Sequence, residues 1–182
     1  MTSLPNVSDD TLIRQFVQGD LLAFDSLYNR HVKLVYNRVR FCIPETDVED
    51  VTQDVFLAVL GALKKFRGEA QFTTWLRSLT NHKVAEYFRR RSRKKEVMQV
   101  DLGHAEQLGD NNSASSLENR IALQCAFNAL PKQYREVILL RIVEDMPFNE
   151  IAMNLKKKPE AVKSLYRRAL AALGAKMETK DE

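Results

Sequence analysis

Residues 66–95 combine aromatic and cationic side chains in a pattern suited to holding nucleic acid. Apolar residues recur there with the spacing of one buried helix face, namely Phe72, Trp75, Leu76 and Leu79. Between Lys83 and Lys95, seven basic residues stand against one acid, Glu86. Cations that complement the dipole of a solvated helix end would account for about two or three of these. The remaining density of charge favours a polyphosphate partner on this helix.

Two short helices joined by a tight turn are predicted near the C-terminus. Apolar spacing predicts one helix over residues 148–155, a turn at 156–158, and a second helix whose buried side includes Leu170 and leaves Leu165 outward. Such a pair in a basic region is typical of a helix-turn-helix, whose second helix enters a major groove. An ordinary helical hairpin with outward cations is the simpler alternative. The candidate DNA contacts off the apolar side are Lys163, Ser164, Arg167 and Arg168.

An acidic segment precedes another predicted helix. Five acids and no cation stand between Pro44 and Asp54. Acids at a helix start are stabilised by the dipole by about 0.3–1 kcal/mol each at most, which accounts for Asp47 and Glu49. Four further residues form a separate stripe at helical spacing, Asp50, Gln53, Asp54 and Leu57. A polar stripe with one apolar anchor suits either a docking surface for a partner helix or a plain solvated surface.

The elements that must position these groups are all predicted to be helices. A first helix is capped by Ser8 or Asp9, and a second spans residues 21–42 before a proline stops it. In the second half, helices are predicted over residues 117–130 and 131–143, the latter opened by proline. Because no stretch of useful length alternates in polarity, we predict no strands and an all-α fold.

Charge divides the chain of 182 residues into two basic parts and an acidic joint. Residues 1–97 carry 16 basic and 12 acidic groups. Residues 98–117 carry no basic group and three acidic groups, and residues 118–182 carry 12 basic and nine acidic groups. The joint is rich in Gly, Asn, Asp and Ser and loses helical periodicity, as linkers do. We therefore predict two small helical domains, at 1–97 and 118–182, joined by a flexible acidic linker at 98–117.

Several other classes of protein lack support. No apolar run approaches the roughly 20 residues that cross a bilayer, and no secretion signal opens the chain, so we expect a cytoplasmic protein without membrane insertion. Cys42 and Cys125 are interpreted as buried free thiols. His31, His82 and His104 have no Cys, Asp or Glu at ligand spacing, and no phosphate-binding loop appears. We expect no enzyme, no cofactor and no metal.

Taken together, these features resemble the extracytoplasmic-function group of bacterial sigma factors, the smallest members of the sigma-seventy family. The matching fragments of the first half are Gly19-Asp20, Ala23-Phe24, Leu27-Tyr28, residues 50–57, Phe66-Arg67-Gly68, Phe72, Trp75-Leu76 and Asn81. Those of the second half are Leu130-Pro131, Arg135, Val137, Leu140, Glu150-Ile151-Ala152, Val162-Lys163-Ser164 and Arg168-Ala169. Their order and spacing, over nearly the whole chain, carry the resemblance.

The resemblance implies a transcription initiation factor that binds RNA polymerase core, directs it to two-part promoters and assists DNA melting. It implies polymerase binding by Asp50, Gln53, Asp54 and Leu57 in a domain like sigma region 2. For the minus-ten element it implies Phe66, Gly68, Glu69, Gln71, Asn81, Arg89, Arg90 and Arg93. For the minus-thirty-five element, in a domain like region 4, it implies Lys157, Lys163, Ser164, Arg167 and Arg168. The implied partners are core polymerase, double-stranded promoter DNA, the melted non-template strand and, as a candidate, an anti-sigma factor.

The residues themselves suggest how melting could work and where this chain departs from the family. Residues 68–71 offer backbone donors and a side-chain amide beside two phenylalanines, which suits a base extracted from the stack at a cost of a few kcal/mol. Stacking on an aromatic stabilises a base by about 1–3 kcal/mol, but Trp75 is predicted to be core. Lys156 stands where the family often has glycine, and Pro147 and Lys158 stand where helix caps are expected.

The main alternative is a helix-turn-helix repressor or activator that binds duplex DNA without polymerase. Residues 50–72 discriminate between the two classes, because a repressor needs neither a docking stripe nor a melting loop. An RNA-binding or adaptor protein would use the cations but would leave the C-terminal helical pair unexplained.

Overall fold

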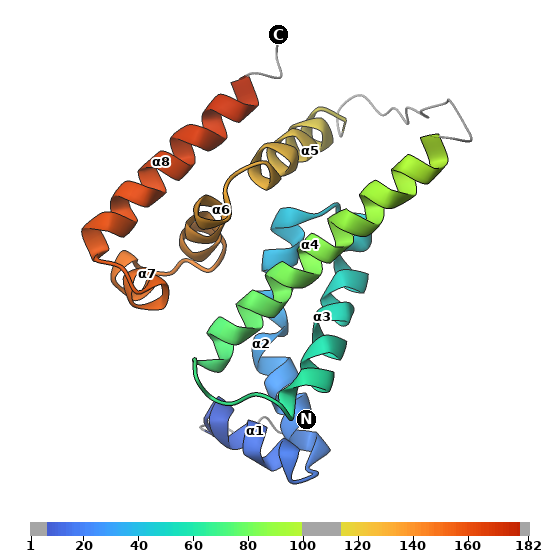
Figure 1. Ribbon diagram of the computed structural model, residues 1–182, viewed down its shortest axis with the longest axis vertical. Helices are drawn as coiled ribbons and strands as arrows, with labels where there is room; N and C mark the ends of the chain where they lie inside the picture. Colours follow the sequence, from blue (N-terminus) through green and yellow to red (C-terminus); the bar gives the residue numbers. More distant parts are fainter. Residues whose placement is uncertain (1–6, 100–113, 179–182) are drawn as a thin grey trace. The chain divides into compact units, whose positions relative to one another are not determined.

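The computed structural model describes residues 7–99 and 114–178, and Figure 1 shows them as helices joined by short turns. The elements are α1 (Asp9–Val17), α2 (Leu21–Cys42), the 3-10 turn η1 (Glu45–Asp47), α3 (Val48–Leu63), α4 (Phe72–Gln99), α5 (Ala114–Asn128), α6 (Lys132–Ile138), the π-helical turn η2 (Leu139–Val143), α7 (Phe148–Leu155) and α8 (Pro159–Glu178). No strand occurs in the described ranges, and the predicted all-α class is confirmed.

The chain divides into two compact units. One comprises Met1–Arg40 and Glu45–Lys95, and the other comprises Phe41–Pro44 and Glu96–Glu182. Helices α4 and α5 extend into the two ends of the predicted linker at 98–117, whose middle lies outside the described residues. None of the described helices has both the length and the apolar character needed to cross a bilayer.

Helix α1 begins and ends as its sequence predicts. The Thr11 backbone N–H donates to Ser8 Oγ at 3.2 Å, which makes Ser8 the N-cap. Its inward face buries three apolar side chains, Leu12, Ile13 and Phe16. After the helix, Gly19 has a φ of 105°, a conformation that glycine adopts without steric cost. The chain therefore reverses at the predicted Gly19 break and enters α2.

The core of the first unit is formed by the apolar faces of α2, α3 and α4. The side chains that are almost completely buried there include Leu27, Val35, Val39, Val55, Val59, Leu63 and Leu76. Each such side chain contributes about 1.5–3 kcal/mol relative to full exposure. Arg38 is also fully buried, and its Nε donates to Asn81 Oδ1 at 3.1 Å, which joins α2 to α4. A buried guanidinium needs such acceptors, because an unpaired buried charge is strongly destabilising.

In the second unit, α8 packs against α5, α6 and α7. Its buried side chains are Val162, Leu165 and Ala169, at the i, i+3 and i+7 positions of one face. Leu170 is 38% exposed, so the prediction that Leu170 is buried and Leu165 outward is wrong. Each residue turns the helix by about 100°. Leu170 directly follows the buried Ala169, so the Leu170 side chain points away from the face that Leu165 and Ala169 share.

The turn between α7 and α8 is left-handed at a lysine. Lys156 has φ 51° and ψ 47°, and the Lys157 N–H donates to the Ala152 carbonyl at 2.9 Å. This bond, together with that from the Lys156 N–H to the Met153 carbonyl, ends α7 in the manner of a Schellman motif. No side-chain hydrogen bond caps the start of α7 at Pro147, in agreement with its sequence.

The predicted single helix over 131–143 consists of α6 followed by a wider turn. In η2 the Glu144 N–H donates to the Leu139 carbonyl, five residues earlier. The chain then turns at Asp145, whose φ is 48°. Arg141 holds this turn, because its Nη1 lies 3.0 Å from Asp145 Oδ1 and its guanidinium lies over the Phe148 ring at 5.4 Å.

The two cysteines differ in exposure. Cys42 is buried, but Cys125 is exposed, so the prediction of two buried thiols is wrong for Cys125. That prediction rested on apolar neighbours in the sequence. Adjacent residues of a helix point about 100° apart, so they do not determine which way Cys125 faces.

Candidate polymerase and nucleic-acid interface

The docking stripe, which we define as Asp50, Gln53, Asp54 and Leu57, lies on the outward side of α3. Asp50 and Gln53 are exposed, Leu57 is 65% exposed, and Asp54 is half-buried. The opposite side of the same helix is buried at Val51, Val55 and Val59. The structure therefore brings the four predicted residues together and leaves one large apolar side chain among polar neighbours in water.

Asp54 also contacts the basic helix α4. Arg90 Nη2 lies 3.0 Å from Asp54 Oδ2 and 3.4 Å from Glu86 Oε1, and Lys83 Nζ lies 3.0 Å from Glu86 Oε2. The hydrogen bond from Lys83 is the main reason that the pKa of Glu86 lies below its usual value. Two residues predicted for different partners, Asp54 and Arg90, are thus bound to each other. No local sequence pattern joins residues 36 apart.

Some basic side chains near the end of α4 contact other residues of the first unit, whereas others are exposed to solvent. The Tyr87 hydroxyl donates to Asp47 Oδ2 at 2.5 Å, and Arg91 Nη1 lies 2.6 Å from the same hydroxyl. This contact assigns Asp47 a role in joining η1 to α4, in addition to its favourable place before α3. Desolvation is the main cause that raises the pKa of Tyr87. Arg89 and Arg93 are exposed.

The loop between α3 and α4 rests on three aromatic rings. Phe66 lies 5.2 Å from Trp75 and 6.0 Å from Phe72, and Phe72 lies 5.7 Å from Trp75. Phe72 is buried and the other two are half-buried, so Trp75 belongs to this packed cluster as predicted. Gly68 has a φ of 70°, which favours glycine at this turn.

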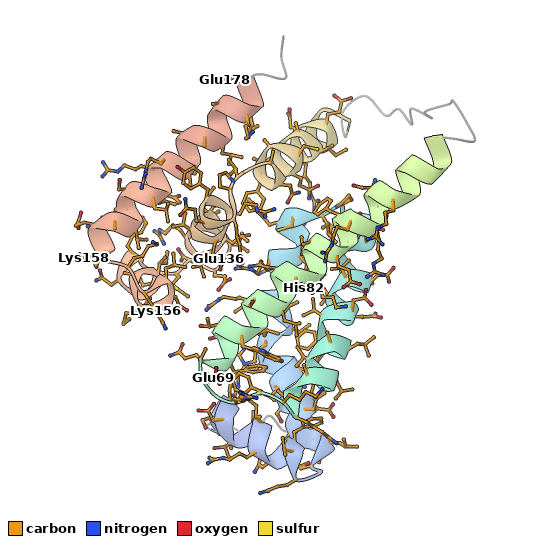
Figure 2. The ribbon with its side chains drawn as sticks, viewed as in Figure 1. Glu69, His82, Glu136, Lys156, Lys158 and Glu178 are labelled. Atoms are coloured by element: carbon orange, nitrogen blue, oxygen red, sulfur yellow. The ribbon has the colours of Figure 1, made fainter. Side chains whose placement is uncertain are left out.

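The polar residues of this loop are exposed. Gly68, Glu69 and Gln71 are all open to solvent, and Figure 2 shows Glu69 on the segment that leads into α4. The Gln71 carbonyl accepts from the Thr74 and Trp75 N–H groups, so Gln71 begins α4 through its backbone. Its side-chain amide is left for other contacts. Asn81, by contrast, is half-buried and serves the buried Arg38, a role that the sequence did not predict.

The predicted upstream-DNA residues lie on α8 and the turn before it. Lys157, Lys163, Arg167 and Arg168 are exposed and Ser164 is half-buried. Lys163 Nζ lies 2.7 Å from Glu160 Oε1, and this bond is the main cause that lowers the pKa of Glu160. The Arg168 Nε donates to the Ser164 carbonyl at 3.4 Å. Figure 2 shows Lys156 and Lys158 at the turn that leads into this helix.

Sequence reasoning missed a polar cluster beside the loop between α3 and α4. Asp9 Oδ1 lies 2.6 Å from Arg30 Nη1, and Asp9 Oδ2 lies 2.9 Å from His31 Nε2. His31 is only 6% exposed and its ring lies 5.2 Å from that of Phe72. Burial lowers the pKa of His31 despite the carboxylate beside it. His31 is therefore a core histidine, and its carboxylate partner lies 22 residues earlier in the chain, beyond any local ligand spacing.

Comparison with known proteins defines the class. The family description Sigma-70 region 2 matches residues 27–94, and Sigma-70, region 4 matches residues 120–173. The RNA polymerase sigma factor NccH of Alcaligenes xylosoxydans xylosoxydans is 30% identical over 178 residues, covering 94% of this chain and 95% of that protein. The ECF RNA polymerase sigma-E factor of Escherichia coli K12 is 27% identical over 182 residues, with the same coverage.

A solved structure supports the same conclusion. The structure of CnrH in complex with the cytosolic domain of CnrY is similar with a TM-score of 0.61 at 30% identity, covering 95% of this chain and 99% of CnrH. The chain belongs to the sigma-70 family, in its extracytoplasmic-function group, and is a promoter-directing transcription initiation factor. This family consists of initiation factors and not of enzymes. The region 2 match covers the docking stripe and the loop, which disfavours the alternative of a polymerase-independent repressor or activator.

Proposed function

We propose that the chain binds RNA polymerase core through the docking stripe on α3. The observation that carries this assignment is Leu57, which is 65% exposed at the C-terminal end of the stripe, one turn after its polar residues. A large apolar side chain held outward on a rigid helix is typical of an anchor for a partner helix. Asp50 and Gln53 would then set the orientation of the partner through polar contacts at the rim of the interface.

The docking assignment is tested by pull-down of core polymerase with a variant that combines Asp50→Arg and Leu57→Ser. Binding to core should fall by at least about tenfold, while the helical circular-dichroism signal stays unchanged. Asp54 is left intact so that its bridge to Arg90 is preserved. The control is Val17→Ser, which removes another exposed apolar side chain, 50% exposed on α1. Normal core affinity in the double variant would sink the assignment.

The domains at 1–97 and 118–182 would divide the two promoter elements between them. In the second, α8 would read the minus-thirty-five element from a major groove, with Ser164 and Arg168 facing base edges. Lys157 would contact phosphate. Substituting Ser164 or Arg168 should then change the preference at particular base pairs, whereas Lys157→Ala should weaken all sequences alike and reduce the salt slope by about one. Equal shifts for every promoter in all three variants would contradict sequence reading by α8.

The first domain would open and hold the minus-ten element. The loop residues Glu69 and Gln71 would contact the extruded strand, while Arg89 and Arg93 would contact its phosphates. Replacing both loop residues with Ala should leave closed-complex binding nearly unchanged and abolish the permanganate reactivity of unpaired thymines. Replacing both arginines with Ala should weaken initial binding in a salt-dependent way. Arg90 is kept in that variant because it also holds Asp54.

A template already mismatched at the minus-ten region separates these two roles. It should rescue the loop variant more than the arginine variant, because mismatch removes the cost of extraction but supplies no phosphate contact. Equal rescue of both variants, or of neither, would show that the loop has no separate part in holding the opened strand. The overall activity is measured by run-off transcription from a promoter library with core polymerase. Absence of promoter-specific transcripts would contradict the whole proposal.

A protein partner that restrains the factor is also part of the proposal. CnrH, the similar solved protein, is bound in its structure to the cytosolic domain of CnrY. We infer that this chain works in the cytoplasm, with the polymerase and the chromosome, and binds an anti-sigma factor of comparable kind. Capture of such a partner with the wild-type chain, and its competition with core polymerase, would test the inference. If the partner and core polymerase bound the chain at the same time, the partner could not restrain the factor by covering its polymerase-binding surface, and the inference would be contradicted.

A further inference from the structure

Ser92 lies among arginines near the end of α4, and neither the docking stripe nor the proposed DNA contacts use it. Arg89, Arg90 and Arg91 directly precede it, and Arg93 follows it. Protein kinases select their substrates partly by the charges that flank the reacting hydroxyl group. Arginines two and three positions before a serine suit a kinase whose substrate site is lined by carboxylates, because a guanidinium binds a carboxylate through two parallel hydrogen bonds. The sequence around Ser92 therefore has the charge pattern of a phosphorylation site.

The helix around Ser92 is accessible from every side. Val84 is the last buried residue of α4 among those whose side chains the structure describes, up to residue 93. All five residues from Arg89 to Arg93 are exposed. Successive helix residues point about 100° apart, so five in a row cover the whole circumference of the helix. Because no residue of this segment is buried in the core, the free energy needed to unwind it locally is small. An enzyme can therefore reach the Ser92 hydroxyl.

A phosphate on Ser92 would meet Arg89. Arg90 and Arg91 are held by acids of α3 and η1, at 3.0 Å and 3.4 Å. Arg89 lies three positions before Ser92, and residues three apart on a helix are close enough to form a charged pair. A phosphate and a guanidinium at this spacing form a charge-assisted contact. The phosphate would thus occupy one of the two arginines that we propose to contact DNA.

We propose that Ser92 is phosphorylated by a protein kinase and that the phosphate weakens the contact of α4 with promoter DNA. The inference rests on the proposed role of Arg89 and Arg93 in contacting DNA phosphates. In the transfer, Ser92 Oγ forms a bond to the γ-phosphorus of a nucleoside triphosphate, the bond from that phosphorus to the β-phosphate oxygen breaks, and a nucleoside diphosphate leaves. The hydroxyl proton passes to a base of the kinase. The product carries a charge of about −1.5 to −2 at pH 7, which neutralises Arg89 and repels the phosphates of DNA.

The first test asks whether Ser92 is the site of transfer. The full-length chain is incubated with γ-labelled ATP and a soluble extract of the cells that make it, and the labelled peptide is mapped by mass spectrometry. The label should lie on Ser92 and should fall about tenfold when Arg89→Gln and Arg90→Gln are combined, because the kinase loses its charged contacts. The control combines Lys64→Gln and Lys65→Gln, which remove two other exposed cations, and should keep the label. Absence of label on Ser92, or equal labelling of all variants, would overturn the proposal.

The second test measures the effect of the phosphate on DNA binding, with phosphoserine installed at position 92 during translation. Holoenzyme with this chain should bind promoter DNA about tenfold more weakly at low salt, with a salt slope lower by about one. Its affinity for core polymerase should stay unchanged. Treatment with a phosphatase should restore DNA binding in the same sample, which separates the effect from a folding defect. Phosphoserine at Gln18, an exposed position in the turn after α1, should leave DNA binding nearly unchanged.

The two possible failures of the second test are distinguishable. If phosphoserine at position 92 leaves DNA binding unchanged while the combined Arg89→Ala and Arg93→Ala variant weakens it, the effect of phosphorylation is refuted and the DNA contact of α4 stands. If neither change weakens binding, the proposed DNA contact fails as well.

Discussion

The Arg90 guanidinium lies 3.0 Å from the Asp54 carboxylate, so that a proposed DNA contact on α4 and a proposed polymerase contact on α3 form one ion pair. Both side chains are substantially exposed, at 58% and 40%. An exposed pair of this kind contributes about 0–1 kcal/mol to stability. Its larger effect would be on the charge offered to DNA, because Asp54 neutralises an arginine that the family resemblance assigns to the minus-ten element.

Removing that neutralisation should strengthen DNA binding by the isolated chain. We expect Asp54→Asn to raise the affinity for random duplex DNA a few-fold at low salt and to steepen the salt dependence, as measured by fluorescence anisotropy. Asp50→Asn removes the same charge one helical turn away, from an exposed site, and should have the smaller effect. Equal gains in the two variants would mean that only net charge matters and that the bridge is irrelevant.

Lys156 has a left-handed backbone conformation in the turn between α7 and α8, so a substitution there should raise the stability of the second unit. Lys156→Gly should stabilise α7 and α8 by about 1 kcal/mol, because glycine has no Cβ to clash at positive φ. Slower hydrogen exchange of the α7 amides would report the change. Lys158→Gly is the matched control, since Lys158 is not among the residues with positive φ. Loss of protection in Lys156→Gly would show that the lysine side chain itself stabilises the turn.

Two glycines of the first unit should respond in opposite ways to the same substitution. Gly61 lies inside α3 with open space around its missing Cβ, so Gly61→Ala should stabilise by about 0.5–1 kcal/mol. Gly68 has a φ of 70°, so Gly68→Ala should strain the loop and slow open-complex formation. Urea unfolding followed by fluorescence of Trp75, the single tryptophan, measures the first effect. A destabilised Gly61→Ala chain would contradict the open surroundings of that residue.

Burial of His31 predicts how the stability of the first unit depends on pH. Its folded pKa lies below the ordinary value of 6.5, so below about pH 6.5 the unfolded chain binds more protons than the folded one. Stability should therefore be fully present above pH 6.5 and decline as the pH falls through the folded pKa. The charges that face His31 are Asp9, Arg30 and Arg77, with Asp9 opposing the decline.

His31→Gln should flatten this decline, as measured by urea unfolding at a series of pH values. His82 is exposed, so His82→Gln should leave the decline unchanged. An equally steep loss of stability in wild type and His31→Gln would assign the effect to the carboxylates. The comparison is made on differences between variants, because other groups titrate in the same range.

Local periodicity predicted the helices well, because burial of one face repeats every 3.6 residues. The range 21–42 coincides with α2, and the outward position of Leu57 followed from the same rule. Long-range pairs were not predictable in this way. Asp9 meets His31 and Asp54 meets Arg90 only after helices pack, and no local pattern specifies partners 22 or 36 residues apart. Periodicity also failed where apolar residues crowd one helix, as Leu165 and Leu170 do on α8.

Helix α4 is uninterrupted from Phe72 to Gln99, so it fixes the distance between residues at its two ends. Phe72 at its start and Arg93 near its end are 21 positions apart on one straight helix, about 32 Å at 1.5 Å per residue (Figure 1). That length equals roughly nine steps of a DNA strand at 3.4 Å each. The distance between the loop proposed to hold the opened strand and the arginines proposed to contact phosphate is therefore fixed by the helix, and a residue inserted into α4 would change that distance.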